Sequence, residues 1–174
     1  MGTTVYTIGH SNRSAAEFLA LLHGHAIELL LDVRTVPRSR HNPQFGQEEL
    51  APMLAAQSIG YEHMPSLGGL RKPRKDSVNG AWRNDSFRGY ADHMATADFQ
   101  QGLAALIESA GRQRTVIMCA EAVPWRCHRS LVADALLARG VDAQEITSPT
   151  STRRHRLTPF AHVEGTTVTY PALV

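Results

Sequence analysis

An almost uninterrupted apolar run, Ile-Glu-Leu-Leu-Leu-Asp-Val at residues 27–33, is the feature that most constrains how this chain of 174 residues can fold. A strand that is apolar on both faces is typical of a parallel sheet that helices cover on both sides. We therefore predict that residues 27–33 form a central parallel strand. Its carboxyl end carries two charged residues, Asp32 and Arg34.

Strand-like and helix-like segments alternate along the whole chain. Further strands are predicted at residues 4–8, 61–64, 115–119 and 141–147. Helices are predicted at residues 14–23, 48–58, 87–110 with a break near 96–98, and 127–139. This alternation predicts one α/β domain over residues 1–174, a three-layer sandwich in which helices flank a mostly parallel central sheet.

Local signals refine this outline. Ser14 and Glu17 have the spacing of a capping box, and Pro52 fits a helix only in its first turn. Residues 65–83 are rich in Gly, Pro and basic side chains, which predicts a functional lid or an insertion. The last strand-like pieces, within residues 160–170, predict a small C-terminal hairpin.

Composition excludes several classes of protein. No apolar stretch is long enough to cross a bilayer and no signal-peptide pattern opens the chain, so we expect a cytoplasmic protein without a membrane partner. Two cysteines do not make a disulfide framework. The net charge is only +2, and three basic clusters, near residues 34–40, 71–75 and 153–156, are expected to be solvated loops.

Polar residues follow three of the predicted strands. His10, Ser11 and Asn12 come after the first strand, Asp32 and Arg34 end the second, and Cys119 with Glu121 ends the fourth. In open parallel sheets, ligands bind beyond the carboxyl ends of the strands. If these strands are neighbours, the three groups line one crevice. The alternative for each is structural: His10 bonds loop backbone, Asp32 pairs with Arg34, and Glu121 bonds its own loop.

The segment from residue 119 to 129 holds both cysteines. Cys127 opens a predicted helix, where unpaired N–H groups and the neighbouring Arg126, His128 and Arg129 favour a thiolate or a bound anion. The alternative is that Cys119 and Cys127 are small buried apolar residues.

Two known patterns resemble this segment only in part. The tyrosine-phosphatase loop has the spacing Cys-x5-Arg, whereas six residues separate Cys119 from Arg126, so that likeness is an analogy. A metal held by Cys119, Cys127, His128 and His10 is a weaker alternative, because the short Cys-x2–4-Cys clip of structural zinc sites is missing. No cofactor is predicted.

Together, the motifs resemble the bacterial and archaeal domain-of-unknown-function 488 family. The likeness rests on residues 6–12, 31–34 with 37–39, 67–69, 88–91 with Met94, 119–121, 127–129 and 157–160. It spans nearly the whole chain and implies an α/β sandwich, and it implies no particular substrate.

These observations lead to three functional hypotheses. The first is an enzyme, a transferase or hydrolase that depends on a thiol or a histidine, for a small anionic or phosphate-containing substrate. Its candidate catalytic residues are Cys119, Glu121, Cys127, His128 and His10, and its candidate substrate-binding residues are Ser11, Asn12, Asp32, Arg34, Arg38, Arg129 and Tyr90. The second is a nucleic-acid-binding or adaptor module that uses the basic clusters at 71–83 and 153–156, with Trp82, Phe87 and Tyr90 as stacking platforms. The third is a redox switch of Cys119 and Cys127.

Overall fold

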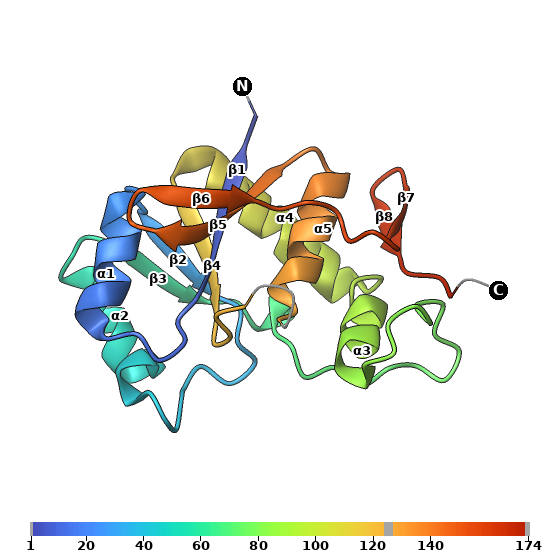
Figure 1. Cartoon of the computed structure of the whole chain (residues 1–174), viewed down its shortest axis with the longest axis horizontal. Coiled ribbons are helices and arrows are strands. Elements are labelled where there is room, and N and C mark those ends of the chain that lie inside the picture. The colour runs from blue at the N-terminus through green and yellow to red at the C-terminus, as the bar shows by residue number, and fades with distance from the viewer. Residues whose placement is uncertain (1, 124–126, 173–174) are drawn as a thin grey trace.

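The computed structural model describes residues 2–123 and 127–172, and at its centre lies a sheet of six strands in the order β3-β2-β4-β1-β5-β6 (Figure 1). The strands are β1 (Thr4–Gly9), β2 (Leu29–Asp32), β3 (Gly60–His63), β4 (Thr115–Cys119), β5 (Asp142–Ser148) and β6 (Ser151–Arg154). The first five are parallel, and β6 runs antiparallel to β5 at the edge. The prediction of a mostly parallel central sheet is confirmed.

Strands β2 and β4 are the interior of this sheet. Every residue of both strands is buried, and Leu30 of β2 lies opposite Val116 of β4. The apolar run at residues 27–33 thus forms a central strand as predicted, although the strand itself is limited to Leu29–Asp32.

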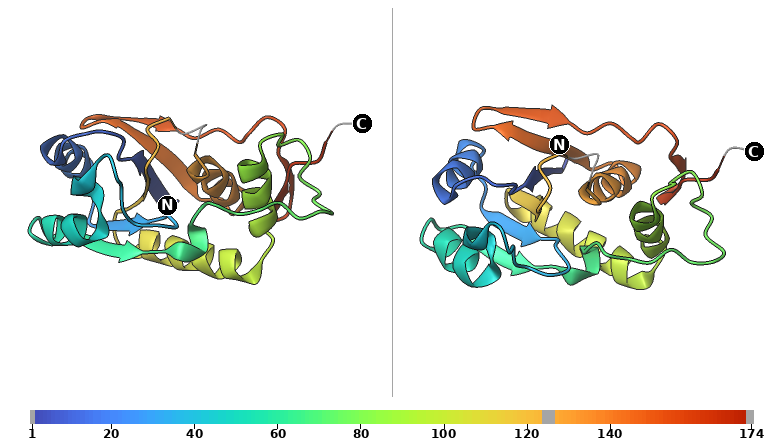
Figure 2. Two further views of the ribbon diagram at one scale, coloured as in Figure 1. Left: turned by 90° about the horizontal axis from the view of Figure 1, so that it is seen from below. Right: turned by 60° about the horizontal axis from the view of Figure 1, so that its bottom comes forward.

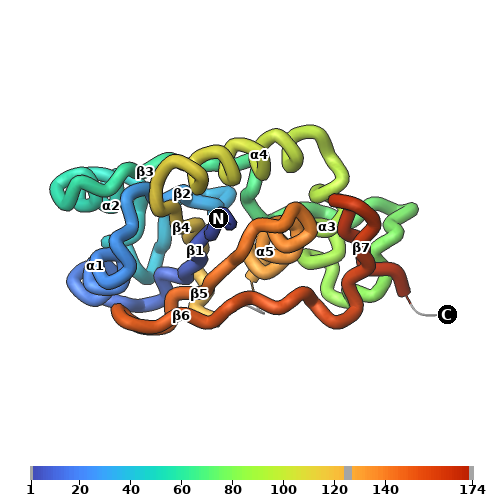
Figure 3. The backbone as a smooth tube through the Cα atoms, turned by 90° about the horizontal axis from the view of Figure 1, so that it is seen from above, coloured from blue at the N-terminus to red at the C-terminus, as the bar shows by residue number. Residues whose placement is uncertain are grey.

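Within the described residues, four of the five helices lie against the two faces of the sheet, and α3 (Asp85–His93) packs beside α5 away from the strands (Figures 2 and 3). On one face lie α1 (Ala15–Gly24) and α2 (Gln47–Ala55), whose Phe18, Leu22, Leu50 and Leu54 share a core with Leu30. On the other face, a second core contains apolar residues of α3 (Asp85–His93), α4 (Ala97–Arg112) and α5 (Arg129–Ala138). The helices and the sheet therefore form the predicted three layers.

Helix boundaries follow the local sequence signals. The capping box of α1 is present, with the Glu17 amide donating to Ser14 Oγ at 3.1 Å and the Ser14 amide donating to Glu17 Oε1 at 3.0 Å. The break predicted near residues 96–98 is the cap of α4, where Thr96 accepts from the Phe99 amide. The placement of Pro52 in a first turn is wrong, because it lies inside α2. Burial of Leu50 and Leu54 on either side of Pro52 holds the helix there despite the missing N–H.

The connections differ more from expectation. Residues 65–84 contain one short 3-10 turn (Pro65–Leu67) and otherwise no regular structure, as the Gly- and Pro-rich composition indicates, and another 3-10 turn (Pro43–Phe45) precedes α2. The expectation that the basic cluster at 153–156 is only a loop is wrong for its first half, since residues 153 and 154 belong to β6. Charged side chains suit an edge strand because they discourage pairing with another chain.

The C-terminal hairpin is confirmed as β7 (His162–Glu164) and β8 (Thr167–Thr169), joined through Gly165 with a φ of 61°. Tyr170 follows it and reaches α5, where its hydroxyl donates to Asp134 Oδ2 at 2.7 Å. Among the described residues, no helix has the length and apolar character that crossing a membrane requires.

Candidate functional site

The three strand ends with polar residues meet at one edge of the sheet. Strand β4 lies between β1 and β2, and the amides that follow its two neighbours both bond to it: His10 N to the Cys119 carbonyl at 2.9 Å and Val33 N to the Met118 carbonyl at 3.0 Å. The expectation that these strands are neighbours is confirmed. The candidate residues therefore share the carboxyl edge, where loops and helix starts gather.

Gly9 allows the loop after β4 to cross the end of β1. A Cβ atom at this position would lie 1.7 Å from the carbonyl oxygen of Glu121, closer than any side chain can come. The chain therefore requires glycine here to bring residues 119–122 against the first strand.

Asp32 and Arg34 form a buried forked ion pair. Arg34 Nε donates to Asp32 Oδ1 at 2.9 Å and Nη2 to Oδ2 at 2.7 Å, with both side chains almost without solvent contact. Tyr61 also donates to Oδ2, at 2.5 Å, and its burial together with the carboxylate raises its pKa. Asp32 thus binds and orients Arg34, and both of its carboxylate oxygens accept hydrogen bonds from other side chains of the protein.

His10 supports this arginine. Its Nδ1 lies 2.8 Å from the Ser11 carbonyl oxygen, which can only accept, so Nδ1 carries the proton and Nε2 presents a lone pair to Arg34 Nη1 at 3.4 Å. The ring stacks on Phe45 with 4.4 Å between the ring centroids. Burial lowers the pKa of His10, which keeps the ring neutral. The contacts of His10 are those of a positioning residue.

Ser11 and Asn12 remain beside this loop. Ser11 adopts a positive φ of 51° and its hydroxyl lies 3.4 Å from Asn12 Oδ1, and neither side chain lines the pocket described below.

The two cysteines are free, buried and electrostatically unlike. A hydrogen bond from the Cys119 thiol, the charge of Arg129 and the Arg129 backbone N–H lower the pKa of Cys127, against the effect of burial. Burial, more than any other cause, raises the pKa of Cys119 well above its ordinary value. Cys127 is therefore the more acidic thiol of the pair.

His128 is placed to exchange a proton with Cys127. Its Nε2 donates to the Val33 carbonyl oxygen at 2.9 Å, so Nδ1 is the unprotonated nitrogen, and it lies 3.6 Å from Cys127 Sγ. Burial lowers the pKa of His128, which favours the neutral ring that a base requires.

Tyr90 packs against this histidine with 4.8 Å between ring centroids. Its hydroxyl donates to the Leu67 carbonyl oxygen at 2.8 Å, and its side chain is fully buried. Tyr90 therefore holds His128 in place and has no surface for a substrate.

Arg129 uses all its donors inside the protein. A guanidinium group has five N–H groups. Two go to the Glu145 carboxylate, from Nε at 3.2 Å and Nη2 at 2.7 Å, and the others to Cys119 Sγ, the Glu121 carbonyl and, at 2.9 Å, the Ala122 carbonyl. Only 1% of Arg129 is exposed. The structure thus gives Arg129 the place of a structural cation that fixes the 119–122 loop, in contrast to its expected part in substrate binding.

A pocket of about 330 Å³ opens over the thiols, and we call it the thiol pocket. The candidate residues that line it are Arg34, Arg38, Cys119, Glu121, Cys127 and His128. Gly69, Leu70 and Phe87 also line it, so the irregular segment 65–84 and the start of α3 form part of its wall. Arg38 is exposed, and so is Glu121, whose Oε1 accepts from the Val123 amide at 3.1 Å.

Two further predictions concern Arg126 and a metal site formed by the cysteines and histidines. Arg126, with its expected contribution to the charge around Cys127, lies outside the described residues. Among the residues that are described, no group of three or more His, Cys, Asp or Glu side chains is arranged to hold a metal ion. His10 contacts Arg34, whereas His128 contacts Cys127.

Sequence reasoning missed Glu145. This carboxylate is buried in β5, accepts from Thr7 Oγ1 and from Arg129, and neutralises the cation beside the thiols. The available signal is its position: Glu145 lies between Ala143 and Ile146, the two buried apolar residues of β5, and a charge there needs a buried partner.

The family model "Domain of unknown function DUF488" matches residues 14–136, which include both cysteines, His128, Arg34 and Arg129. No curated protein and no solved structure shows significant similarity to the chain.

Proposed function

Because the chain belongs to the DUF488 family, a domain of unknown function, we propose from the site itself that it is an enzyme whose Cys127 thiolate attacks a small anionic substrate in the thiol pocket. The observation that carries the proposal is the contact between Cys127 Sγ and the unprotonated Nδ1 of His128, 3.6 Å apart, in a pocket with two arginines. A thiol with a lowered pKa beside a neutral histidine is the arrangement of an activated nucleophile.

The proposed reaction is a group transfer through a covalent adduct of Cys127. His128 Nδ1 takes the thiol proton, and the sulfur forms a bond to the electrophilic atom of the substrate as the bond to the leaving group breaks. His128 returns the proton to the leaving group. Water or a second acceptor then gives its proton to His128 Nδ1 and bonds to the transferred group as the bond to the Cys127 sulfur breaks. His128 returns this proton to the sulfur, which restores the Cys127 thiol and completes a hydrolase or transferase cycle.

Arg38 and Arg34 are the proposed anion ligands. Arg38 lines the pocket and is exposed, with no carboxylate partner among the described residues. Arg34 uses three N–H groups on Asp32 and His10, which leaves two that meet no acceptor within the described ranges. Arginine forks of this kind suit phosphate and carboxylate groups.

Selective alkylation tests the nucleophile. Iodoacetamide at neutral pH, followed by peptide mass spectrometry, is expected to modify Cys127 and to spare Cys119, since the thiolate is the reacting form. Inorganic phosphate is expected to slow this reaction by occupying the pocket. Arg38→Gln should remove the protection, whereas Arg40→Gln, an exposed arginine that does not line the pocket, should retain it. Preferential labelling of Cys119, or equal protection in both variants, would contradict the proposal.

A thiol redox switch is a second candidate, favoured by two free, buried thiols that influence each other's pKa. Diamide would take two electrons and two protons from the pair and leave a disulfide between Cys119 and Cys127. The expected result is loss of alkylation that dithiothreitol reverses; continued alkylation after diamide excludes the switch. Both candidates require reduced thiols, and for that reason we place the protein in the cytoplasm.

A further inference from the structure

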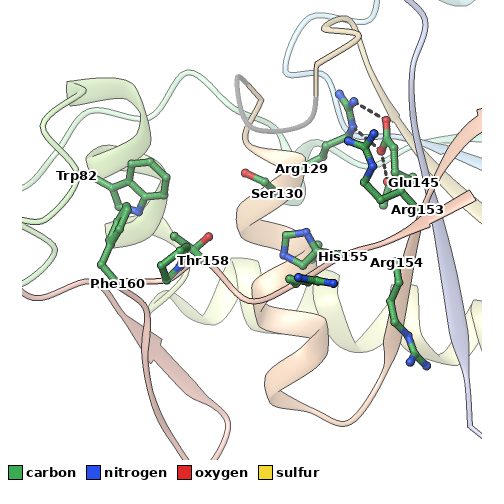
Figure 4. Close-up of a pocket in the computed structure, with 13 residues that line it drawn as sticks. Trp82, Arg129, Ser130, Glu145, Arg153, Arg154, His155, Thr158 and Phe160 are labelled. Carbon is green, nitrogen blue, oxygen red and sulfur yellow. Dashed lines mark hydrogen bonds and ion pairs between the residues drawn. The ribbon is translucent and has the colours of Figure 1, made fainter.

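A second and larger pocket, of about 880 Å³, lies on the other side of the first turns of α5, between that helix and the chain from β6 to residue 160 (Figure 4). We call it the basic pocket. It shares one residue with the surroundings of the thiols: Arg129 lines the basic pocket, and its Nη1 donates to Cys119 Sγ. The two pockets are therefore separate spaces on either side of one guanidinium group.

The basic pocket has an excess of unpaired positive charge. Arg153 and Arg156 line it, both are exposed, and neither makes an ion pair with a carboxylate of the described residues. The other charges there are compensated, because Glu145 pairs with Arg129, Arg154 with Asp142 and His155 with Asp134. What remains is a site for an anion that accepts from two arginines.

The opposite end of the basic pocket is aromatic. Figure 4 shows Trp82 and Phe160 together at one end and Arg153 at the other. The two rings meet nearly at a right angle, with 4.8 Å between centroids and 75° between planes, and Phe160 is 38% exposed. The buried Trp82 Nε1–H has no acceptor among the described residues. This end therefore offers apolar ring surface to a planar group.

We propose that the basic pocket binds a nucleotide unit, with its phosphate on Arg153 and Arg156 and its base against Trp82 and Phe160. Its volume lies in the range of pockets that enclose ligands of nucleotide size, about 300–1,000 Å³. The pocket combines an anion site with an aromatic platform, which are the two parts that recognise a nucleotide unit. This unit is either a free nucleotide or part of a single strand. The inference does not depend on the thiol chemistry, because none of these four residues lines the thiol pocket.

Calorimetric titration with adenosine 5′-monophosphate tests the charge contacts. The double variant R153Q/R156Q is expected to lower the affinity by about tenfold or more, since two charge-assisted contacts are lost. The matched control is K72Q/K75Q, which removes the same charge from two exposed lysines outside the basic pocket. At physiological salt it should change the affinity by about twofold or less, because remote charges are screened. Equal loss in both variants overturns the proposal.

The base contact and the source of the nucleotide have their own readouts. Phe160→Ala should weaken binding of adenosine 5′-monophosphate and leave that of ribose 5-phosphate unchanged; equal loss for both ligands overturns the base contact. A single-stranded oligonucleotide is titrated in parallel. Binding of the oligonucleotide alone, abolished by R153Q/R156Q but not by K72Q/K75Q, assigns the unit to a single strand. If neither ligand binds the unmodified protein, the proposal is wrong.

Discussion

Arg129 is the residue on which the site most depends. It is buried beside Glu145 and bonds to Cys119 and two loop carbonyls. Arg129→Gln leaves the buried Glu145 charge without its partner, so we expect the free energy of unfolding to fall by about 3–5 kcal/mol. Urea denaturation measures this change.

An exposed pair provides the control for Arg129. Arg112 and Glu108 are 3.5 Å apart on α4, each 68% exposed, and Arg112→Gln should cost at most about 1 kcal/mol. If the two glutamine variants are equally stable, Arg129 is not the buried structural cation that its contacts indicate.

At the residue scale, the sequence indicated the right neighbourhood but not every role. Cys127 and His128 were identifiable because a thiol and a histidine open a helix after a buried strand. The roles of Arg129 and Tyr90 were not, because a charged or hydroxylated side chain in a motif looks the same whether it faces a ligand or buried protein atoms. Only the fold shows that Glu145, distant in the sequence, forms an ion pair with the Arg129 guanidinium.

Among the elements, α5 has a second task besides carrying the thiol site. Asp134, fully buried in this helix, accepts from His155 at 2.8 Å, from the Thr158 amide at 3.0 Å and from the Tyr170 hydroxyl at 2.7 Å. One carboxylate thus anchors three points of the chain after β6.

Asp134→Asn should loosen this C-terminal segment. Asparagine places an N–H donor against neighbours that are themselves donors. We therefore expect the free energy of unfolding to fall by about 2–4 kcal/mol and hydrogen exchange over residues 155–170 to become faster. Asp142→Asn breaks the pair with the exposed Arg154 and should cost about 1 kcal/mol or less. Exchange over residues 155–170 that is unchanged in Asp134→Asn would contradict the anchoring role.

Elements with strong local signals were predictable and those that depend on distant contacts were not. The capping box at Ser14 and the cap at Thr96 set helix starts through neighbouring residues alone. Strand β6 has the sequence Ser-Thr-Arg-Arg, which lacks an apolar alternation, and it exists because β5 offers a free edge.

Three histidines among the described residues have a pKa that the fold lowers. Burial lowers the pKa of His10, His93 and His128 from 6.5. Below about pH 6.5 the unfolded chain binds more protons at these positions than the folded chain does, so stability is lost as pH falls from that value. The loss is expected to reach about 1.4 kcal/mol per pH unit for each histidine until its pKa in the folded protein is passed.

Urea denaturation at pH 7.0, 6.0 and 5.0 measures this dependence. His93→Gln removes one of the three groups and should give a flatter slope between these values. Equal stability at pH 7.0 and 5.0 in the unmodified protein would show that the histidines are not held neutral by the fold.

The architecture as a whole followed from the alternation of strands and helices, since crossover connections place successive strands in parallel. The position of each strand in the sheet did not, because it depends on which apolar faces fit together. For example, the sequence does not show that β4 lies between β2 and β1, on which a shared crevice depends.

The place of β1 between β4 and β5 has a consequence for how the protein is made. Strand β1 pairs with Val116 on one side and with Ala143 on the other, and both lie far downstream, so β1 is synthesised long before either neighbour exists. Arg129, the cation beside the thiols, is synthesised before its partner Glu145. The thiol pocket is therefore assembled late in synthesis, and an unfinished chain exposes its cysteines without the charge balance that the completed sheet provides.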